Sequence, residues 1–359
     1  MARAAEARPG VIELEVEVEG LTERALAYPA LTGPVAAGDA VLLNTTAGAL
    51  GLGTGGWHFV VAVEGQADID PPEPGHVMKL RYTPLQAKVE AVEEQDGPHR
   101  EAFEAVAVLD GTPVTWVPLH SMLGAASAGA KAAGAERVVH VMTDGAALSA
   151  WFSRQMHDLR EAGLVDAVVT SGQAFGGDLE AVNVFSGLLA ARSVGAADVV
   201  VVADGPGKVG TGTRWGASDV SSGMSLNAAG ILGGRPVAAL RLNFSDRSYR
   251  HHGVSPHSIT VLSEVALVPV HVAVPSLDEE RRGQVWETLK EAGLEERHQL
   301  VEVTGQPALD LLAEVGMGAE TMGRSLEEEP AFFLAAGAAG VLAGRMAAGD
   351  SRWRDEVEG

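Results

Sequence analysis

Residues 245–258 concentrate side chains that can perform acid–base or metal chemistry. This segment holds three of the chain's eleven histidines, together with two arginines and one aspartate. Histidine titrates near neutral pH and is a common metal ligand, and arginine binds phosphate through a planar fork of N–H groups. The pattern predicts a His/carboxylate metal site, or a histidine acid–base catalyst beside phosphate-binding arginines. The candidates are Asp246, Arg247, Arg250, His251 and His257.

A divalent metal in this segment would be held by His251, His257 and Asp246. Their spacing matches no standard metal motif, so a surface loop of hydrogen-bonded polar residues is the alternative interpretation. The chain contains no cysteine, which excludes disulfides, thiolate nucleophiles and cysteine-ligated zinc or iron–sulfur clusters.

A second segment, residues 204–216, combines closely spaced glycines with two cations and opens with Asp204, a candidate catalytic carboxylate. Backbone N–H groups of such a loop can cradle a phosphate or carboxylate. The spacing formally fits G-x-G-x-x-G, but no helix opens at the third glycine, so we discount NAD. A glycine loop without a ligand is the alternative. The candidate anion-binding residues are Gly205, Gly207, Lys208, Gly210, Thr211, Gly212, Thr213 and Arg214.

Residues 170–180 form a third candidate loop, whose first interpretation is helix capping, with Asp178 as the cap. Capping does not explain the remaining small and polar residues of this connection, which suggest a backbone shaped around a ligand. Asp144, after the neighbouring predicted strand, is expected to join it. The other candidates are Ser171, Gln173, Gly176 and Gly177.

Short apolar runs separated by amphipathic stretches are expected to position these loops. The runs recur about every 30 residues, a pattern typical of a parallel sheet, and the candidate loops follow them, where open α/β sheets bind ligands. We therefore predict a Rossmann-like, doubly wound α/β domain over residues 119–359. The predicted strands lie at 138–142, 166–169, 198–203, 237–242, 268–274 and 300–303.

Residues 1–118 have a different pattern and predict a small all-β barrel or sandwich domain. Residues 11–19 alternate apolar residues with glutamates, so one face should be solvated. Further strands are expected at 40–44, 57–63 and 77–82. The Asp110-Gly111 pair predicts a hairpin joining strands 105–108 and 113–116.

Composition restricts the partners. With 26 basic and 48 acidic residues, the 359-residue chain carries a net charge of -22, which disfavours nucleic acid and anionic membranes. Residues 1–10 lack the apolar core of a signal peptide, and the run at 331–343 is shorter than the roughly 20 residues of a membrane span. A cytoplasmic location follows. A Ser-x-x-Glu capping box at Ser325 predicts an Ala-rich C-terminal helix, buried in the core or packed on a second subunit.

Four stretches together resemble a bacterial family, domain of unknown function three-eight-six-six. They lie at residues 143–147, 172–181, 205–213 and 245–257, and the similarity covers most of the chain. The family motif has a His-His pair where this chain has Pro256 and His257, so no role requiring a histidine at 256 is carried over. The resemblance implies a bacterial origin and supports the choice of loops, but it supplies no reaction.

Two hypotheses for function follow. The first is an enzyme, a hydrolase or transferase, that binds a small phosphorylated metabolite on residues 205–214 and uses His251 or His257 for acid–base chemistry or metal binding. The second is a non-catalytic binding or assembly protein that works as a homo-oligomer.

Overall fold

The computed structural model describes residues 2–51, 56–66, 74–245 and 252–350, with only the backbone for residues 2–5. The chain divides into two compact units, Met1–Glu94 and Gln95–Gly359. The first unit contains β1 (Ala2–Arg8), β2 (Val11–Val18), β3 (Leu21–Ala27), α1 (Pro29–Thr32), β4 (Val41–Asn44), α2 (Thr46–Ala49), β5 (Trp57–Val63), β6 (Val77–Lys79) and β7 (Ala87–Val89).

The first unit is built on a mostly antiparallel sheet. Among the described residues its five strands have the order β1-β2-β3-β5-β4, with β3 and β5 parallel. Alternation along β2 buries Leu14 and Val16 in the core, while Glu15 and Glu17 face solvent as their period of two predicts. Glu13 is the exception, because it is buried in an ion pair with Arg8.

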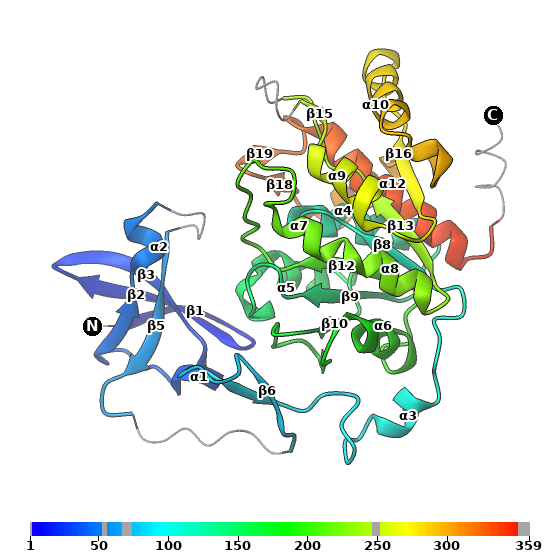
Figure 1. The fold of residues 1–359 in the computed structure, drawn as a ribbon. Coiled ribbons are helices and arrows are strands. Elements are labelled where there is room, and N and C mark those ends of the chain that lie inside the picture. The colour runs from blue at the N-terminus through cyan, green and yellow to red at the C-terminus, as the bar shows by residue number, and fades with distance from the viewer. Residues whose placement is uncertain (1, 52–55, 67–73, 246–251, 351–359) are drawn as a thin grey trace. The chain divides into compact units, whose positions relative to one another are not determined.

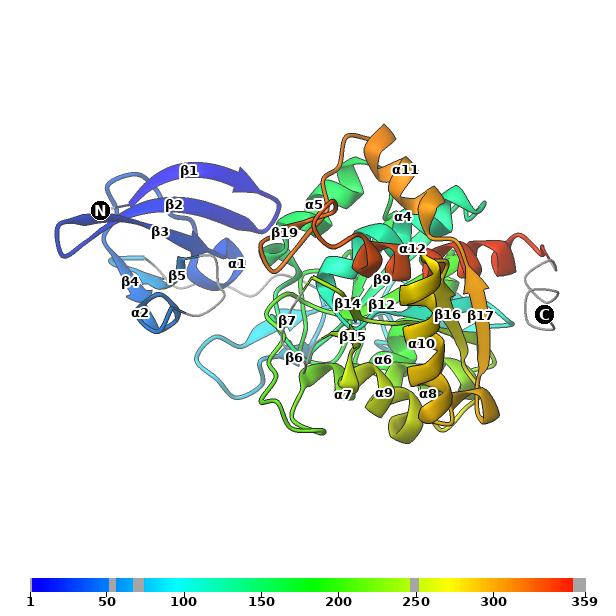
Figure 2. The same cartoon turned by 90° about the horizontal axis from the view of Figure 1, so that it is seen from above.

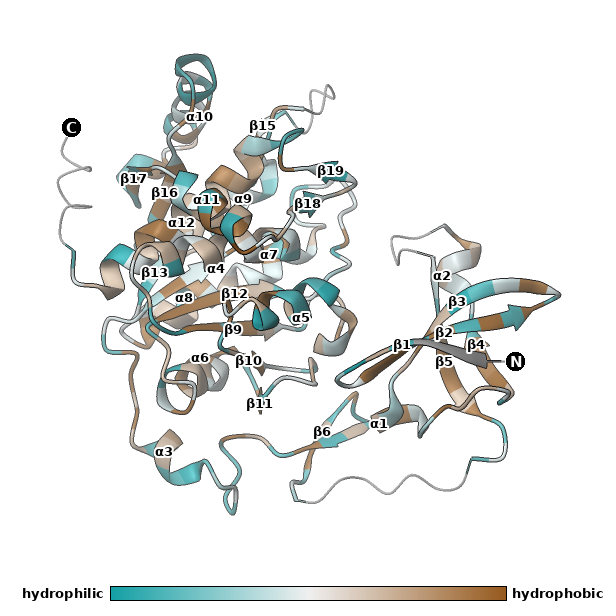
Figure 3. Ribbon diagram, turned by 180° about the vertical axis from the view of Figure 1, so that it is seen from behind, coloured by the Kyte–Doolittle hydropathy of each residue, from teal (hydrophilic) through white to brown (hydrophobic). Residues whose placement is uncertain are grey.

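The second unit surrounds a large parallel sheet (Figure 1). Its strands are β8 (Pro113–Trp116), β9 (Val138–Thr143), β10 (Ala167–Thr170), β11 (Leu179–Glu180), β12 (Val199–Asp204), β13 (Arg235–Ala239), β16 (His271–Pro275) and β17 (Gln299–Val303). Within the described ranges the order is β11-β10-β9-β12-β8-β13-β16-β17. The mixed α/β class with a parallel sheet is thus confirmed. Figure 3 shows β9 and β12 as strongly hydrophobic, as expected for strands covered on both faces.

Residues 113–116 correct the predicted hairpin. β8 lies between β12 and β13 and pairs with both in parallel. Residues 105–108, the other predicted strand of the hairpin, form no strand and come directly after helix α3 (Arg100–Glu104). The turn at Asp110 and Gly111 exists, with positive φ at both residues, but Leu109 and Gly111 donate hydrogen bonds to the carbonyls of Leu232 and Gly233. Non-local pairing therefore overrides the local hairpin signal.

Helices cover both faces of the large sheet (Figure 2). α4 (Leu123–Ala132), α5 (Arg154–Glu161), α11 (Gln306–Glu314) and α12 (Pro330–Ala347) share one core cluster, and α8 (Met224–Ile231) and α10 (Glu279–Glu291) share another. The remaining α-helices and strands are α6 (Val184–Ser193), α7 (Ser218–Ser222), β14 (Leu242–Asn243), β15 (Gly253–Val254), α9 (Pro256–Thr260), β18 (Glu320–Thr321) and β19 (Arg324–Ser325).

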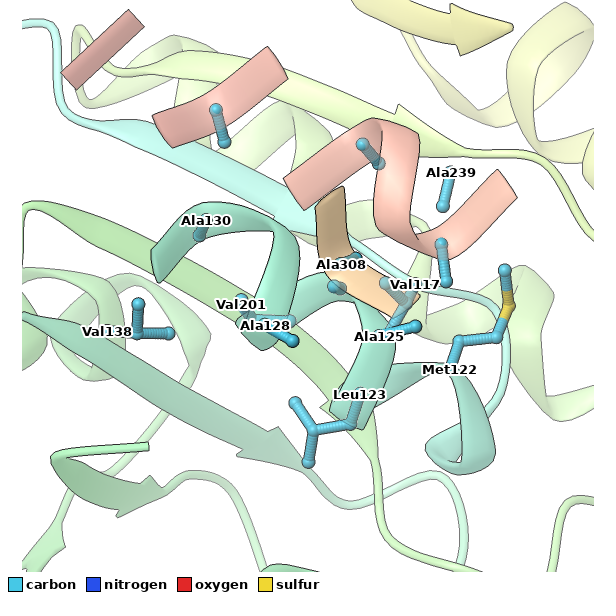
Figure 4. Close-up of a cluster of buried hydrophobic side chains, with 14 of the residues drawn as sticks. Val117, Met122, Leu123, Ala125, Ala128, Ala130, Val138, Val201, Ala239 and Ala308 are labelled. Atoms are coloured by element: carbon cyan, nitrogen blue, oxygen red, sulfur yellow. The ribbon is translucent and has the colours of Figure 1, made fainter. Parts of the chain in front are cut away.

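α12 is a core helix, as one of the two interpretations of its sequence predicted. Its glycines allow close approach to α4: a Cβ at Gly344 would lie 2.5 Å from the Ala130 carbonyl oxygen, and one at Gly340 would overlap Ala126. Figure 4 shows Ala125, Ala128 and Ala130 at this contact. α12 is the one helix of the described residues long and apolar enough to cross a membrane, but 78% of it is buried.

The start of α12 differs from the predicted capping box. Ser325 belongs to β19, and the helix begins at Pro330 with Glu329 at the N-cap. The side chain of Glu328 does accept the Ser325 N–H, at 2.8 Å. Proline at the first helical position needs no N–H partner and has its φ preset for a helix, which explains the later start.

Candidate functional site

The connections after β9 and β12 diverge. From β9 the chain passes through α5 to β10 on one side, whereas from β12 it passes through α7 and α8 to β13 on the other. β9 and β12 are neighbours in register, with Thr143 opposite Asp204. In open parallel sheets this divergence opens a crevice at the carboxyl ends of the strands, where ligands bind. The strand order of the second unit therefore indicates where a ligand site would lie.

A cavity of about 230 Å³ occupies this position. Its polar lining includes two carboxylates and several hydroxyl groups, and Val184 and Met224 supply apolar surface. None of the side chains that line it is a lysine, arginine or histidine. The lining residues are Thr143, Asp144, Gly145, Ser171, Gly172, Asn183, Val184, Asp204, Ser221, Ser222, Met224 and Ser225.

Asp204 is one of the two carboxylates of this cavity. It ends β12, is 8% exposed, and its Oδ1 accepts hydrogen bonds from Thr143 Oγ1 (2.7 Å) and the Gly145 N–H (3.0 Å). Burial raises the pKa of Asp204, and the nearby Asp144 charge adds to this, although the hydrogen bonds oppose it. A carboxyl group with a raised pKa in a cavity is suited to proton transfer.

Glycines bring the second carboxylate close to the backbone of the next loop. Asp144 Oδ2 accepts the Gln173 N–H at 2.8 Å. Gly172 has φ +67°, and a Cβ there would overlap the Asp144 carboxylate. A Cβ at Gly145 would come within 2.7 Å of both Asp204 oxygens. These positions require glycine because the carboxylates fill the space of a side chain.

Two histidines near Asp204 and Val201 of β12, the partly buried His120 and the buried His140, were not anticipated. His120, just after β8, has its Nδ1 3.1 Å from the Asp204 carbonyl oxygen and its Nε2 2.6 Å from Ser153 Oγ. Burial lowers the pKa of His120 to about 4, so the ring is neutral at pH 7. A carbonyl can only accept, so Nδ1 donates and Nε2 accepts the Ser153 hydroxyl proton. His120 thereby positions Asp204.

His140 lies in β9 and is fully buried. Its Nδ1 donates to the Val201 carbonyl at 2.9 Å, and its Nε2 has no partner within the described part of the chain. Burial is the main reason that its pKa falls to about 3, and the nearby His120 lowers it further. The sequence signal for both histidines was weak: each follows or interrupts an apolar strand, and their partners are distant in sequence.

The glycine-rich loop is largely bonded to itself. Thr211 N–H donates to the Gly216 carbonyl at 2.7 Å, and the hydroxyls of Thr211 and Thr213 are 3.0 Å apart. Gly207 and Gly212 have positive φ, Gly210 bridges to Ala217, and Gly205 packs on Ala147. The glycines are therefore explained at least in part by turns and packing. In the described structure, residues 205–216 do not line the cavity.

Both cations of this loop have acidic partners. Lys208 forms an ion pair with the buried Asp219, a residue that sequence analysis did not select, and Arg214 pairs with the exposed Glu264. Burial lowers the pKa of Lys208, and the charge of Asp219 opposes this.

His257 joins the two loops that the sequence singled out. Its Nε2 donates to the Thr213 carbonyl at 3.1 Å, so the two segments meet at this point. Asp246, Arg247, Arg250 and His251 lie outside the described residues. Among the described residues, no group of three or more His, Asp and Glu side chains has the arrangement of a metal site.

Asp178 does not cap a helix, which corrects the first interpretation of residues 170–180. Its Oδ2 accepts the Val168 N–H and its Oδ1 pairs with Arg160, whereas Asn183 caps α6. Gly176 packs on Trp151 and Gly177 on the Val168 carbonyl. Of this loop, only Ser171 and Gly172 line the cavity together with Asp144.

Comparison with known proteins agrees with the resemblance seen in the sequence. The family model described as "Protein of unknown function (DUF3866)" matches residues 24–340. Searches of curated proteins and of solved structures found no match. Since the family model spans most of both units, including every residue that lines the cavity, the chain belongs to this protein family of unknown function.

Proposed function

We propose that the chain is an enzyme that binds a small, polar, phosphorylated metabolite at the carboxyl ends of β9, β10 and β12. The observation that carries this proposal is the 230 Å³ cavity at the divergence of β9 and β12, with Asp204 in its lining. A doubly wound, Rossmann-like course of the second unit is part of the proposal, because that architecture binds ligands at such a divergence.

Asp204 acts as the general acid–base group. Its raised pKa keeps a proton available closer to neutral pH, and Thr143 and Gly145 hold the carboxyl group in one orientation. Asp144, on the other connection, contacts the polar body of the ligand through the oxygen that does not accept the Gln173 N–H. The hydroxyl groups of Ser171 and Ser222 donate to the carbonyls of Met142 and Asp219, so they can accept hydrogen bonds from the hydroxyl groups of a metabolite. A hydrolase or transferase reaction fits these groups.

The acidic composition supports an enzyme without nucleic-acid or membrane partners, and a bacterial, cytoplasmic protein remains part of the proposal. The net charge of -22 opposes binding to polyanions.

The test is a thermal-shift and turnover screen of phosphorylated metabolites, with and without Mg²⁺, on the wild type, Asp204→Asn and the control Asp310→Asn. Asp310 is exposed on α11. A ligand at 100 times its Kd should stabilise the wild type by about 2.7 kcal/mol. Asp204→Asn should lose about 100-fold or more in turnover, and Asp310→Asn should match the wild type. Turnover that survives Asp204→Asn would reject the catalytic assignment.

A non-catalytic homo-oligomer is the second candidate, favoured by exposed apolar residues near the end of α8. Ile231 in α8 is 67% exposed, and Leu267 is 78% exposed. Leu267 lies beside α8, because its N–H donates a hydrogen bond to the side chain of Asn227 in that helix. Light scattering on the wild type and Leu267→Glu tests this candidate. A monomeric wild type would exclude it.

A further inference from the structure

A group of cations from three separate segments lies beside the loop that follows β12. Lys208 comes from that loop, Arg241 follows β13, and Arg324 comes from β19. The electrostatic effect of Arg241 reaches Lys208, and that of Arg324 reaches Arg241, in each case lowering the pKa of the neighbouring cation. The tertiary structure therefore gathers three positive charges in a protein with a net charge of -22.

Carboxylates lie close to this group of cations. Asp219 is fully buried and pairs with Lys208. Glu329 is 2% exposed, lies 3.9 Å from Arg324, and already accepts the N–H groups of Phe244 (3.1 Å) and Ser245 (3.0 Å). Three cations thus face three carboxylates, because the charge of Asp204 also reaches Lys208, and Glu329 is occupied largely by backbone donors.

Arg241 is the least satisfied of the three cations. Its main chain is fixed, since its N–H binds Ser258 Oγ (3.2 Å) and its carbonyl accepts the Ser255 N–H (2.9 Å). The one described partner of its guanidinium is the Met322 thioether, at 3.9 Å, which is a weak acceptor for a group with five N–H donors. Burial lowers the pKa of Arg241, and the charge of the nearby Asp219 opposes this. A partly buried guanidinium normally has a carboxylate or phosphate partner.

We propose that Arg241, Arg324 and Lys208 form an oxyanion subsite that binds the phosphate group of the metabolite. Arg241 presents its planar fork to two phosphate oxygens, a geometry that suits phosphate and carboxylate alike. Lys208 and Arg324 add charge from either side, with Asp219 holding Lys208 in place. Of these three cations, only Lys208 was predicted from the sequence, because Arg241 and Arg324 do not lie in a glycine-rich motif.

This subsite rests on the proposed function and supplies what the cavity lacks. The cavity is lined by Asp144 and Asp204 and by no cation, so it would repel a phosphate group. Lys208 is four residues beyond Asp204, and their charges interact. One small ligand can therefore place its polar body against the carboxylates and its anionic end on the cations.

The experiment is a calorimetric titration of the full chain with inorganic phosphate at constant ionic strength, with acetate and chloride as comparison anions. Variants are Arg241→Gln, Arg324→Gln and the control Lys290→Gln, which removes the same charge from an exposed position on α10. We expect phosphate to bind more tightly than acetate. We expect binding to weaken at least tenfold in the first two variants and to stay within twofold in the control.

Three results would overturn the subsite: no phosphate binding by the wild type, equal binding by all variants, or an equal loss in Lys290→Gln. Two measurements distinguish a role of Arg241 in phosphate binding from a purely structural role. They are phosphate binding by Arg241→Lys, which keeps the charge but lacks the planar fork, and the melting temperature of each variant. If Arg241 instead turns onto the unpartnered Oδ1 of Asp219, Arg241→Gln will lower the melting temperature without changing phosphate binding.

Failure of the subsite and failure of the proposed function give different results. If Arg241→Gln loses phosphate binding but no metabolite is found whose turnover needs Asp204, the subsite is retained and the proposal of an enzyme is rejected. A metabolite whose turnover needs Asp204 but whose affinity is the same in Arg241→Gln would reject the subsite and retain the enzyme.

Discussion

At the residue scale, the two cavity carboxylates depend on glycines that leave them room. Gly172→Ala combines a left-handed backbone with overlap between the new Cβ and Asp144. The left-handed backbone costs about 1–2 kcal/mol, and forced packing adds about 1–3 kcal/mol. Gly163→Ala is the matched control, because Gly163 has nearly the same φ, +69°, with nothing within 4 Å. Denaturant unfolding should show the larger loss for Gly172→Ala; equal losses would mean that the contact with Asp144 has no energetic effect.

The buried neutral His140 makes stability depend on pH. Its pKa is about 3 in the folded chain, against an ordinary value of 6.5. Between these values the unfolded chain binds a proton that the folded chain does not, so the free energy of unfolding falls as pH falls below 6.5. One such proton changes the free energy of unfolding by up to about 1.4 kcal/mol per pH unit.

Denaturant unfolding between pH 5 and 6.5 measures this slope, in a range where ordinary carboxyl groups stay ionised. His140→Gln should have a smaller slope than the wild type, and the exposed His252→Gln is the control. Burial also lowers the pKa of His120, His271 and His298, so part of the wild-type slope should remain. An unchanged slope in His140→Gln would show that His140 is not the source.

The residues of the candidate site that directly follow a strand could be predicted from the sequence. Asp144, Ser171 and Asp204 were identified because each stands just after an apolar run, and all three line the cavity. His120 and Arg241 were missed, since their importance comes from partners brought together by the tertiary structure. Asp178 was interpreted as a helix cap because an aspartate in a glycine-containing connection fits the pattern of a helix cap as well as it fits the pairing with Arg160 that the structure shows.

At the element scale, α12 and α4 approach closely through glycines. Gly340→Ala should destabilise the protein by roughly 1–3 kcal/mol, because the new Cβ would overlap the Ala126 carbonyl, which is part of a packed helix and cannot move away freely. Gly283→Ala in α10, where no atom lies within 4 Å, is the control and should stabilise by about 0.5–1 kcal/mol. Thermal unfolding measures both. Similar effects of the two substitutions would contradict the close packing.

Elements buried on both faces were the easiest to predict. β9, β10, β12 and β17 match the predicted apolar runs to within a residue or two at each end. β8 was assigned to the wrong sheet because its neighbours, β12 and β13, lie about 85 and 120 residues further along the chain, which no local pattern reveals. The two-residue strand β11 is too short to carry a signal.

At the scale of the whole molecule, the second unit contains the complete cavity. Every lining residue falls between Thr143 and Ser225, and the proposed anion subsite ends at Arg324. Residues 95–359 alone should therefore fold and bind phosphate with an affinity within a few-fold of the full chain. Circular dichroism and calorimetry on this fragment test the prediction. A fragment that folds but does not bind would assign part of the site to the first unit.

The position of α12 also has a consequence for how the chain is made. The apolar face of α4, near residue 125, emerges from the ribosome long before residues 330–347, which cover it. The first unit can fold while translation continues, but the second cannot close its core until its last helix is released. A premature stop before residue 330 should therefore yield an aggregating product instead of a shortened folded protein, and nascent second units should be a target for chaperones.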